Sequence, residues 1–326
     1  MSRRAFITGG TGFVGLNLIE ALQKKNWEIF ALHRPASNLK HLSQFNVTLL
    51  EGDIDDFNSL SAVFPDDIDV VFHVASNTSV WAKNNAQQYQ TNVIGAQNMV
   101  ECALKKNAKR FIYTSSIAAY GIQTTYVNED TASNAESCGI NYCKTKYLAE
   151  KEIQKAVEKG LNAVILNPVH IVGKYDSSNW AQLIQVVASD ELPGIPSGVG
   201  MFCYVKDIIN AHIAAIDTGQ NGENYMLGGP EAGIKEVINE IQKILGLKES
   251  GKITPNWVLQ LGTYIFMVGS LFSSKEPQLT PEKFEMITGK MVCDYAKAER
   301  ELGYQITPLN VSLAESYEWL KKENLL

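Results

Sequence analysis

The sequence predicts an α/β protein, with a doubly wound parallel sheet and a smaller, mostly helical C-terminal lobe. Short apolar runs alternate with amphipathic helical stretches through the first half of the chain, as in sheets whose crossovers are helices. A glycine-rich turn over residues 8–15 joins the first apolar run to the first helix. The alternation becomes irregular after residue 172, where we expect the second lobe to begin.

The bulk properties fit this architecture and exclude several classes of function. We assign residues 1–172, with 201–229 returning to them, to the sheet domain, and residues 173–200 and 230–326 to a substrate-binding lobe. The hydrophobic content of 45% and the charged content of 20% are those of ordinary globular proteins. The net charge of −6 provides no basic surface for nucleic acid or anionic membranes.

The cysteines and the apolar segments indicate in which cellular compartment the protein is expected. The five cysteines form no Cys-x-x-Cys pair and are odd in number, which predicts reduced thiols in a cytoplasmic protein. Arg3-Arg4 resembles the start of an export signal only superficially, because the glycine turn follows it. The apolar run over residues 257–272 is shorter than the roughly 18–20 residues that span a bilayer. We predict a buried or substrate-pocket helix there, with membrane-surface contact as the alternative.

The expected elements of the sheet domain follow in order. Residues 5–7 form the first strand, and the helix over residues 12–25 places Val14, Leu18 and Leu22 on one face. Later apolar runs predict strands, and two long amphipathic stretches predict helices. The further strands are residues 28–32, 47–50, 70–74, 110–114 and 161–166, the last broken by Asn167-Pro168, and the long helices are residues 89–105 and 141–159.

The second half is less regular. Residues 190–200 hold two prolines and three glycines and predict a surface or lid loop. Residues 202–205 and 224–227, with a helix over 207–216 between them, are expected to return to the main sheet. The remainder is expected to be mostly helical, and four prolines act as breakers. These are Pro255, Pro277, Pro281 and Pro308.

The glycine turn predicts a phosphate cradle of the Rossmann type. Gly9 permits a tight turn, Gly12 lets backbone amides approach a pyrophosphate, and Gly15 permits close packing of helix on strand. The helix N-terminus offers free amides and the positive end of its dipole to the phosphates. A turn without a ligand is the alternative. Thr11, Phe13 and Val14 belong to the same predicted cofactor site.

The residue after the second strand predicts which dinucleotide binds. NAD enzymes usually place an acid there for the ribose hydroxyls, whereas an arginine accommodates the 2′-phosphate of NADP. This strand ends in His33-Arg34 without an acid, and Lys40 adds a second cation. NADP(H) is therefore favoured over NAD(H), unless Arg34 is only a solvated loop residue.

Tyr142 and Lys146, downstream of Thr114-Ser115-Ser116, predict proton chemistry at a carbonyl or alcohol. The four-residue step places Tyr142 and Lys146 on one helix face, so that the ammonium lowers the phenol pKa towards working pH. A serine from the preceding strand then holds the substrate oxygen. Such a tyrosine–lysine spacing also occurs by chance in exposed helices, but the upstream serine argues against that. His73 and His170 lack metal-ligand spacing and suit packing or cofactor lining, and no metal site is predicted.

Taken in chain order, these residues resemble the extended short-chain dehydrogenase/reductase superfamily, which includes NAD-dependent epimerases and dehydratases. Residues 73–82 are most similar to the dihydroflavonol-4-reductase-like branch, and Arg34-Pro35 suits its NADPH-using members. The segments that carry the resemblance are Gly52-Asp53-Ile54, His73-Val74-Ala75-Ser76, Thr91-Asn92-Val93-Ile94-Gly95, residues 113–121, Tyr204-Val205-Lys206-Asp207 and residues 297–304.

The resemblance implies roles for individual residues. By the register of the resemblance Ser116, not Ser115, is the catalytic serine that binds the carbonyl oxygen. Tyr142 is the general acid, and Lys146 binds the nicotinamide ribose and lowers the Tyr142 pKa. Asn92 supports a water relay or a structural hydrogen bond. The remaining expected cofactor-binding residues are Asp53, Ile54, Val74, Ala75, Ser76, Thr114, Pro168 and Val169. The expected substrate-pocket walls are Trp81, Tyr120, His170, Met201, Phe202 and Tyr204.

Three functions remain open at this point. The first is an NADPH-dependent reductase of an aldehyde or ketone, and the second is an epimerase or dehydratase of a sugar or sugar nucleotide. Residues 199–203 are uncharged, which favours an apolar substrate over a nucleotide diphosphate. The third is an NADP-binding sensor without turnover, although such relatives usually lose the tyrosine or lysine. The expected partners are a small carbonyl or alcohol substrate and a second copy of the chain, paired through the two long helices.

Overall fold

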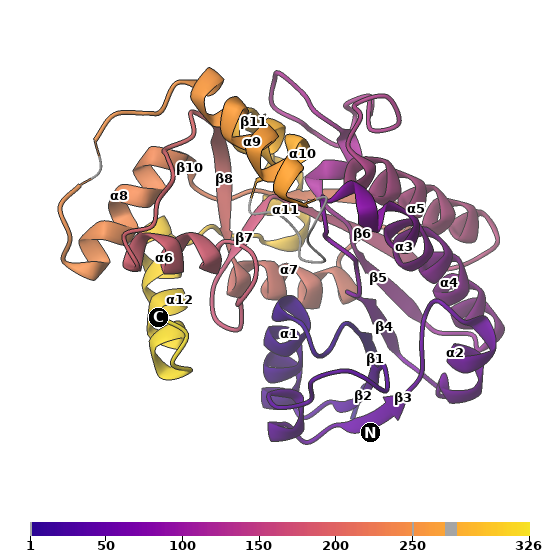
Figure 1. The fold of residues 1–326 in the computed structure, drawn as a ribbon. Helices are drawn as coiled ribbons and strands as arrows, with labels where there is room; N and C mark the ends of the chain where they lie inside the picture. The colour runs from indigo at the N-terminus through magenta and orange to yellow at the C-terminus, as the bar shows by residue number, and fades with distance from the viewer. Residues whose placement is uncertain (1, 250, 271–278) are drawn as a thin grey trace.

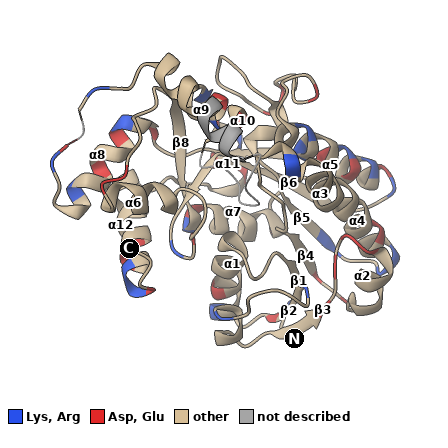
Figure 2. Cartoon of the chain, in the orientation of Figure 1, with Lys and Arg blue, Asp and Glu red and all other residues tan. Residues whose placement is uncertain are grey.

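The computed structural model describes residues 2–249, 251–270 and 279–326. A seven-stranded parallel sheet occupies one half of the molecule, and a smaller, mostly helical lobe lies beside the carboxyl ends of its strands (Figure 1). Both the α/β class and the helical C-terminal lobe are confirmed. In Figure 2, acidic and basic residues are interspersed along the helices and loops.

The main sheet has the strand order β3-β2-β1-β4-β5-β6-β9, and every pair in it is parallel. The change of direction between β1 and β4 creates the crevice in which doubly wound sheets bind ligands. The strands are β1 Arg4–Thr8, β2 Glu28–His33, β3 Thr48–Glu51, β4 Val70–His73, β5 Arg110–Thr114, β6 Ala163–Pro168 and β9 Asn224–Leu227.

The expected break at Asn167-Pro168 is wrong. Asn167 pairs with Met226 and Pro168 with Leu227, so both residues belong to β6. Pro168 is the last residue of the strand, and its missing N–H therefore interrupts no further ladder bond. The consequence is that Asn167 stays buried within the sheet while Pro168 reaches the crevice.

Helices cover both faces of the main sheet. In Figure 1, α1 and α7 lie on one face and α2, α4 and α5 on the other. The long helix expected over residues 89–105 begins earlier, at Asn85, and contains a π-helical turn, Gln90–Ile94. The next residue, Gly95, lies so close to Ile54 that a Cβ there would meet the Ile54 side chain. The helices are α1 Phe13–Lys24, α2 Phe57–Val63, α3 Asn85–Tyr89, α4 Gly95–Lys105, α5 Asn141–Glu158 and α7 Val205–Asp217.

Residues 202–205 were expected to return to the main sheet, but Val205 begins a helix and residues 199–204 join a different sheet. They form β8, the centre of a second sheet in which β7 and β11 pair parallel to it and β10 antiparallel. Residues 190–198 form the expected loop, but Val199 and Gly200 already belong to β8. A strand that is buried on both faces has the same apolar sequence pattern in either sheet, so the pattern could not show which sheet this strand joins. The other strands are β7 His170–Val172, β10 Glu231–Gly233 and β11 Lys290–Met291.

The helical lobe has its own apolar core, to which α6, α8 and α12 contribute Ile184, Ile238 and Leu320. Pro281 is the first residue of α10, Pro308 caps α12 and Pro255 precedes α9, whereas Pro277 lies outside the described residues. The helices are α6 Ala181–Ala188, α8 Ile234–Leu245, α9 Asn256–Ser270, α10 Pro281–Thr288, α11 Ala296–Leu302 and α12 Leu309–Lys322.

The apolar run over residues 257–272 forms α9 as far as Ser270, while residues 271 and 272 lie outside the described part of the chain. The expectation of a buried helix holds for Leu259 but not for Trp257, whose surface is 69% exposed. Within residues 2–249, 251–270 and 279–326, no helix is long and apolar enough to cross a membrane.

Candidate active site

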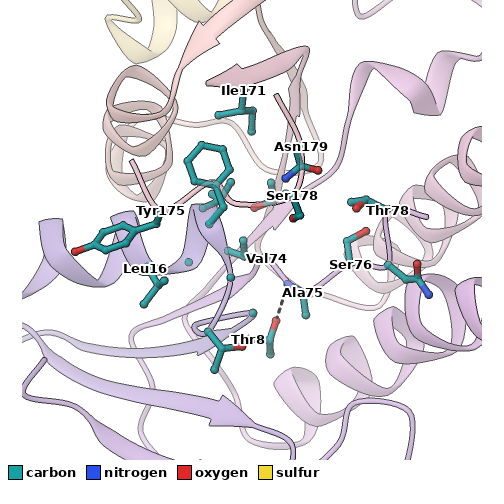
Figure 3. Close-up of a pocket in the computed structure, with 18 of the residues that line it drawn as sticks. Thr8, Leu16, Val74, Ala75, Ser76, Thr78, Ile171, Tyr175, Ser178 and Asn179 are labelled. Atoms are coloured by element: carbon teal, nitrogen blue, oxygen red, sulfur yellow. Dashed lines mark hydrogen bonds between the residues drawn. The ribbon is translucent and has the colours of Figure 1, made fainter. Parts of the chain in front are cut away.

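A cleft of about 970 Å³ opens at the carboxyl ends of the main-sheet strands, between the sheet and the helical lobe. Its floor is the turn between β1 and α1, and one wall is the segment after β4, which includes Val74 and Ala75 (Figure 3). Thr8 joins floor and wall, because its Oγ1 accepts a hydrogen bond from the Ala75 N–H at 3.2 Å. Ser178 and Asn179 reach the cleft from the loop before α6.

The floor of the cleft has the geometry of a phosphate cradle. Gly9 has a φ of +73°, and a Cβ there would lie 2.7 Å from the Ala75 nitrogen. A Cβ at Gly15 would lie 2.1 Å from the Gly9 oxygen, so only glycine permits this approach of helix to strand. Gly12 begins α1 without a side-chain cap, which leaves the first-turn amides available to a ligand. These residues fit a dinucleotide pyrophosphate.

The structure brings Ser116, Tyr142 and Lys146 together along the cleft. Ser116 follows β5, and its Oγ accepts a hydrogen bond from the Ala118 N–H at 3.1 Å. Burial raises the pKa of Tyr142 to about 12, and the hydrogen bond with Ser116 is the interaction that lowers it. The sequence predicted that Lys146 lowers the Tyr142 pKa, and the structure does not show this. Burial outweighs the hydrogen bond that lowers the Tyr142 pKa, and that hydrogen bond comes from Ser116.

Lys146 is 2% exposed and donates its Nζ to the Thr114 carbonyl oxygen at 3.0 Å. The ammonium also lies 5.2 Å from the centre of the Tyr113 ring. Burial lowers the pKa of Lys146 to about 8, and the carboxylate of Glu150 opposes that shift. The lysine is thus held at the end of β5, one residue before the two serines.

A buried carboxyl group supports this end of the cleft, and sequence reasoning missed it. Glu150 accepts hydrogen bonds from Ser115 Oγ, from Asn167 Nδ2 at 2.6 Å and from Asn224 Nδ2 at 3.0 Å. Asn167 also donates to the Ser116 carbonyl oxygen at 3.1 Å. Burial raises the pKa of Glu150, while these donors and Lys146 lower it. Glu150 lies one turn after Lys146, but its partners come from three different strands or their ends.

Two buried histidines complete the polar layer under the cleft. His73 Nδ1 lies 2.8 Å from Thr8 Oγ1, and His212 Nε2 lies 2.8 Å from Thr114 Oγ1. Burial lowers the pKa of His73 to about 3 and that of His212 to about 4, so both rings are neutral at pH 7. Neither ring lines the cleft. Of the two roles expected for His73, packing is the one observed.

The far end of the cleft, beyond β2, is charged and open to solvent. Arg34 and Lys40 line it together with His41, and both Arg34 and Lys40 are exposed. Lys40 Nζ lies 2.7 Å from Glu323 Oε2, at the end of the C-terminal helix α12. Within the described part of the chain, Arg34 makes no ion pair, which leaves its guanidinium available to a phosphate.

Comparison with known proteins places the chain in a family. The model of the NAD dependent epimerase/dehydratase family matches residues 5–228. The chain belongs to this family. It is therefore an NAD(P)-dependent oxidoreductase that acts on an alcohol or carbonyl group.

Several relatives are distant in sequence but match more than nine tenths of the chain. A Synechocystis sp. protein provisionally named dihydroflavonol 4-reductase is 27% identical over 97% of this chain and 94% of its own length. The 3 beta-hydroxysteroid dehydrogenase/Delta 5-->4-isomerase of Mycobacterium tuberculosis is 27% identical over 93% of this chain and 86% of its own. The crystal structure of gox2253 has a TM-score of 0.86 at 27% identity, with 100% of both chains covered.

The cleft contains nearly all of the residues that the sequence assigned to this family's cofactor. Only Asn92 lies elsewhere. It is buried, accepts from the Asn77 N–H at 2.7 Å and donates to Thr145 Oγ1 at 3.1 Å, so its hydrogen bonds join its helix to two other segments. The predicted cofactor residues that line the cleft are Gly9, Thr11, Gly12, Phe13, Val14, Gly15, Arg34, Lys40, Asp53, Ile54, Val74, Ala75, Ser76, Thr114, Tyr142, Lys146, Pro168 and Val169.

The expected substrate walls need correction. His170 lines the cleft, but Trp81, Tyr120, Met201, Phe202 and Tyr204 do not. Four of these five side chains are buried in the protein core because β8 and the 3-10 helix after β5 turn them inward, and Trp81 packs against Lys83. The described residues that line this end instead include Val80, Ile117, Ile171, Trp180, Met286 and Met291.

Proposed function

We propose that this protein is an NADPH-dependent reductase of an apolar aldehyde or ketone. The observation that carries the proposal is the division of charge along the cleft. Among the described lining residues, Lys146 is the only lysine or arginine at the catalytic end, and the others are Arg34 and Lys40 beyond β2. A nucleotide sugar would bring a diphosphate to the catalytic end, where no further cation of this kind is described. The steroid named in the mycobacterial relative is consistent with an apolar substrate.

The residues of the catalytic end suit proton donation to a carbonyl oxygen. A pKa of about 12 keeps the Tyr142 phenol protonated at neutral pH, as a general acid must be. Ser116 donates a hydrogen bond to the same oxygen, and Tyr142 transfers its proton to it as the carbonyl is reduced. The nicotinamide, when bound, supplies the hydride to the carbonyl carbon. Lys146, held by the Thr114 carbonyl oxygen, lines the same end of the cleft and supplies a positive charge there.

The preference for NADPH rests on Arg34. The segment after β2 carries no carboxylate for ribose hydroxyls, and the Arg34 guanidinium lines the cleft there. A bidentate contact with the 2′-phosphate would stabilise NADP(H) selectively. Asp53 lines the same end, in the segment expected to contact the adenine.

The proposal is tested by following NADPH oxidation with a panel of apolar aldehydes and ketones. Turnover in wild type, lost in Tyr142→Phe and kept in Tyr147→Phe on the same helix, would support it. The same samples are incubated with UDP-sugars and analysed for epimers. Sugar inversion without net cofactor oxidation, and no carbonyl reduction, would replace the proposal with epimerase chemistry.

We also infer a homodimer through the outer faces of α4 and α5. Tyr89 precedes α4 on the same helical stretch and is 42% exposed, and Tyr147 on α5 is half-buried. Light scattering decides this: a dimeric mass that persists in a Tyr89→Lys, Tyr147→Lys variant would exclude these faces as the interface.

A further inference from the structure

The C-terminal helix contributes residues to the end of the cleft where the cofactor's 2′-phosphate is proposed to bind. Trp319, Glu323 and Leu325 line the cleft there, opposite the segment that follows β2. Glu323 is 283 positions from Lys40 in sequence, yet the two side chains form an ion pair of 2.7 Å. No sequence motif predicts this carboxylate, and the family's glycine turn and catalytic residues do not involve it.

The surroundings of Glu323 fix its position. His41 Nε2 lies 3.8 Å from the Glu323 carboxylate, and the His41 ring lies 5.8 Å from the Trp319 ring and 5.7 Å from that of Tyr175. Gln185 Nε2 donates to the Leu325 carbonyl oxygen at 2.8 Å. The hydrogen bond from Lys40 holds the pKa of Glu323 below its usual value, so the carboxylate is charged at neutral pH.

The two cations of this end are therefore in different states. Arg34 makes no ion pair in the described part of the chain, whereas the ammonium of Lys40 is already neutralised by Glu323. The Lys40 side chain is 61% exposed and that of Glu323 is 16% exposed, so the lysine can leave while the carboxylate stays. A phosphate at Arg34 would compete with Glu323 for Lys40 and would also be repelled by the Glu323 charge.

We propose that Glu323 is a specificity-determining residue that limits the preference for NADP(H). Binding of NADP(H) exchanges the Lys40–Glu323 ion pair for a Lys40–phosphate pair, whereas NAD(H), which lacks the 2′-phosphate, leaves the ion pair intact. This inference rests on the proposed NADP(H) site at Arg34. Exposed ion pairs contribute little, so the expected effect is small: Glu323→Gln should tighten NADPH binding about two- to fivefold and leave NADH binding unchanged.

The test is calorimetric titration of NADPH and NADH into wild type, Glu323→Gln, Lys40→Met and the double variant at low ionic strength, where exposed charges are least screened. Lys40→Met should weaken NADPH binding more in the Glu323→Gln background than in wild type, because the free lysine is then fully available. Glu318→Gln, an exposed carboxylate on the same helix, is the control for net charge.

The outcomes separate this inference from the proposed function. If Arg34→Ala weakens NADPH selectively but Glu323→Gln leaves NADPH binding unchanged, weakens it, or alters both cofactors equally, the role of Glu323 is wrong and the NADP(H) site stands. If Arg34→Ala has no selective effect, the 2′-phosphate site and the role of Glu323 are both overturned. An equal gain in Glu318→Gln would attribute the effect to net charge and also contradict the inference.

Discussion

The two ends of the cleft are built in opposite ways. At the catalytic end, Ser116 follows the sheet strand β5, and Tyr142 and Lys146 lie on α5, which packs on that sheet. Lys146 and Glu150 are both buried there. The far end of the cleft is exposed. There the Lys40–Glu323 ion pair joins the segment after β2 to the residue that follows the last helix. Burial shifts pKa values strongly at the first end, whereas screened charges act at the second. Large effects on rate should therefore come from the catalytic end and small effects on selectivity from the other.

The largest expected effect is the loss of turnover in Tyr142→Phe. Removal of the general acid should lower kcat about 10²- to 10⁴-fold while cofactor affinity stays within twofold, since no phosphate or adenine contact changes. NADPH oxidation kinetics and calorimetry on the same sample measure the two quantities. A variant with nearly full activity would remove Tyr142 from the chemistry.

Acid should destabilise the protein through the buried layer. The pKa of His212 is lowered from 6.5 to about 4, so the folded state requires the neutral ring. The contribution of the neutral ring to the free energy of unfolding is complete above pH 6.5 and is lost as the pH falls towards 4. The loss is about 3 kcal/mol for one such group. Urea unfolding between about pH 7 and pH 4 measures the dependence of the free energy of unfolding on pH. His212→Gln should show a shallower slope than wild type; an equal slope would exclude His212 as a source.

Glu150→Gln should lower the free energy of unfolding by about 1 to 3 kcal/mol, because the amide keeps only one acceptor oxygen. Its NH2 group must then face a donor, either that of Asn224 or those of Asn167 and Ser115. Chemical denaturation of the variant, compared with Glu158→Gln at the exposed end of the same helix, checks the value. Equal stability of the two variants would show that the buried network tolerates a neutral side chain.

The same contrast explains what the sequence could predict. Gly9 and Tyr142 lie in short motifs beside a strand or helix, so their spacing indicated the site, and the family resemblance selected Ser116 from the two adjacent serines. Glu150 was missed, because its importance depends on Asn167 and Asn224, which reach it only when β6 and β9 pair. The expected walls Met201, Phe202 and Tyr204 were misplaced for a related reason: an apolar run buried on both faces marks a strand but does not tell which sheet it joins.

The far end could not be predicted beyond Arg34. Lys40 was expected to bind phosphate, and the sequence gives no sign that Glu323 already neutralises it. Such a contact is set by how the C-terminal helix packs, which involves aromatic rings of Trp319 and Tyr175 from separate segments. Tertiary packing, not local pattern, decides the charge balance of this region.

The most direct test of the account is the binding of NADPH and NADH to wild type, Arg34→Ala and Tyr142→Phe. We predict that wild type prefers NADPH and that Arg34→Ala weakens NADPH about tenfold or more with NADH unchanged, since a charge-assisted contact is lost. Tyr142→Phe should bind both cofactors as wild type does. A wild-type preference for NADH, or equal weakening of both cofactors in Arg34→Ala, would contradict the assignment of the two ends.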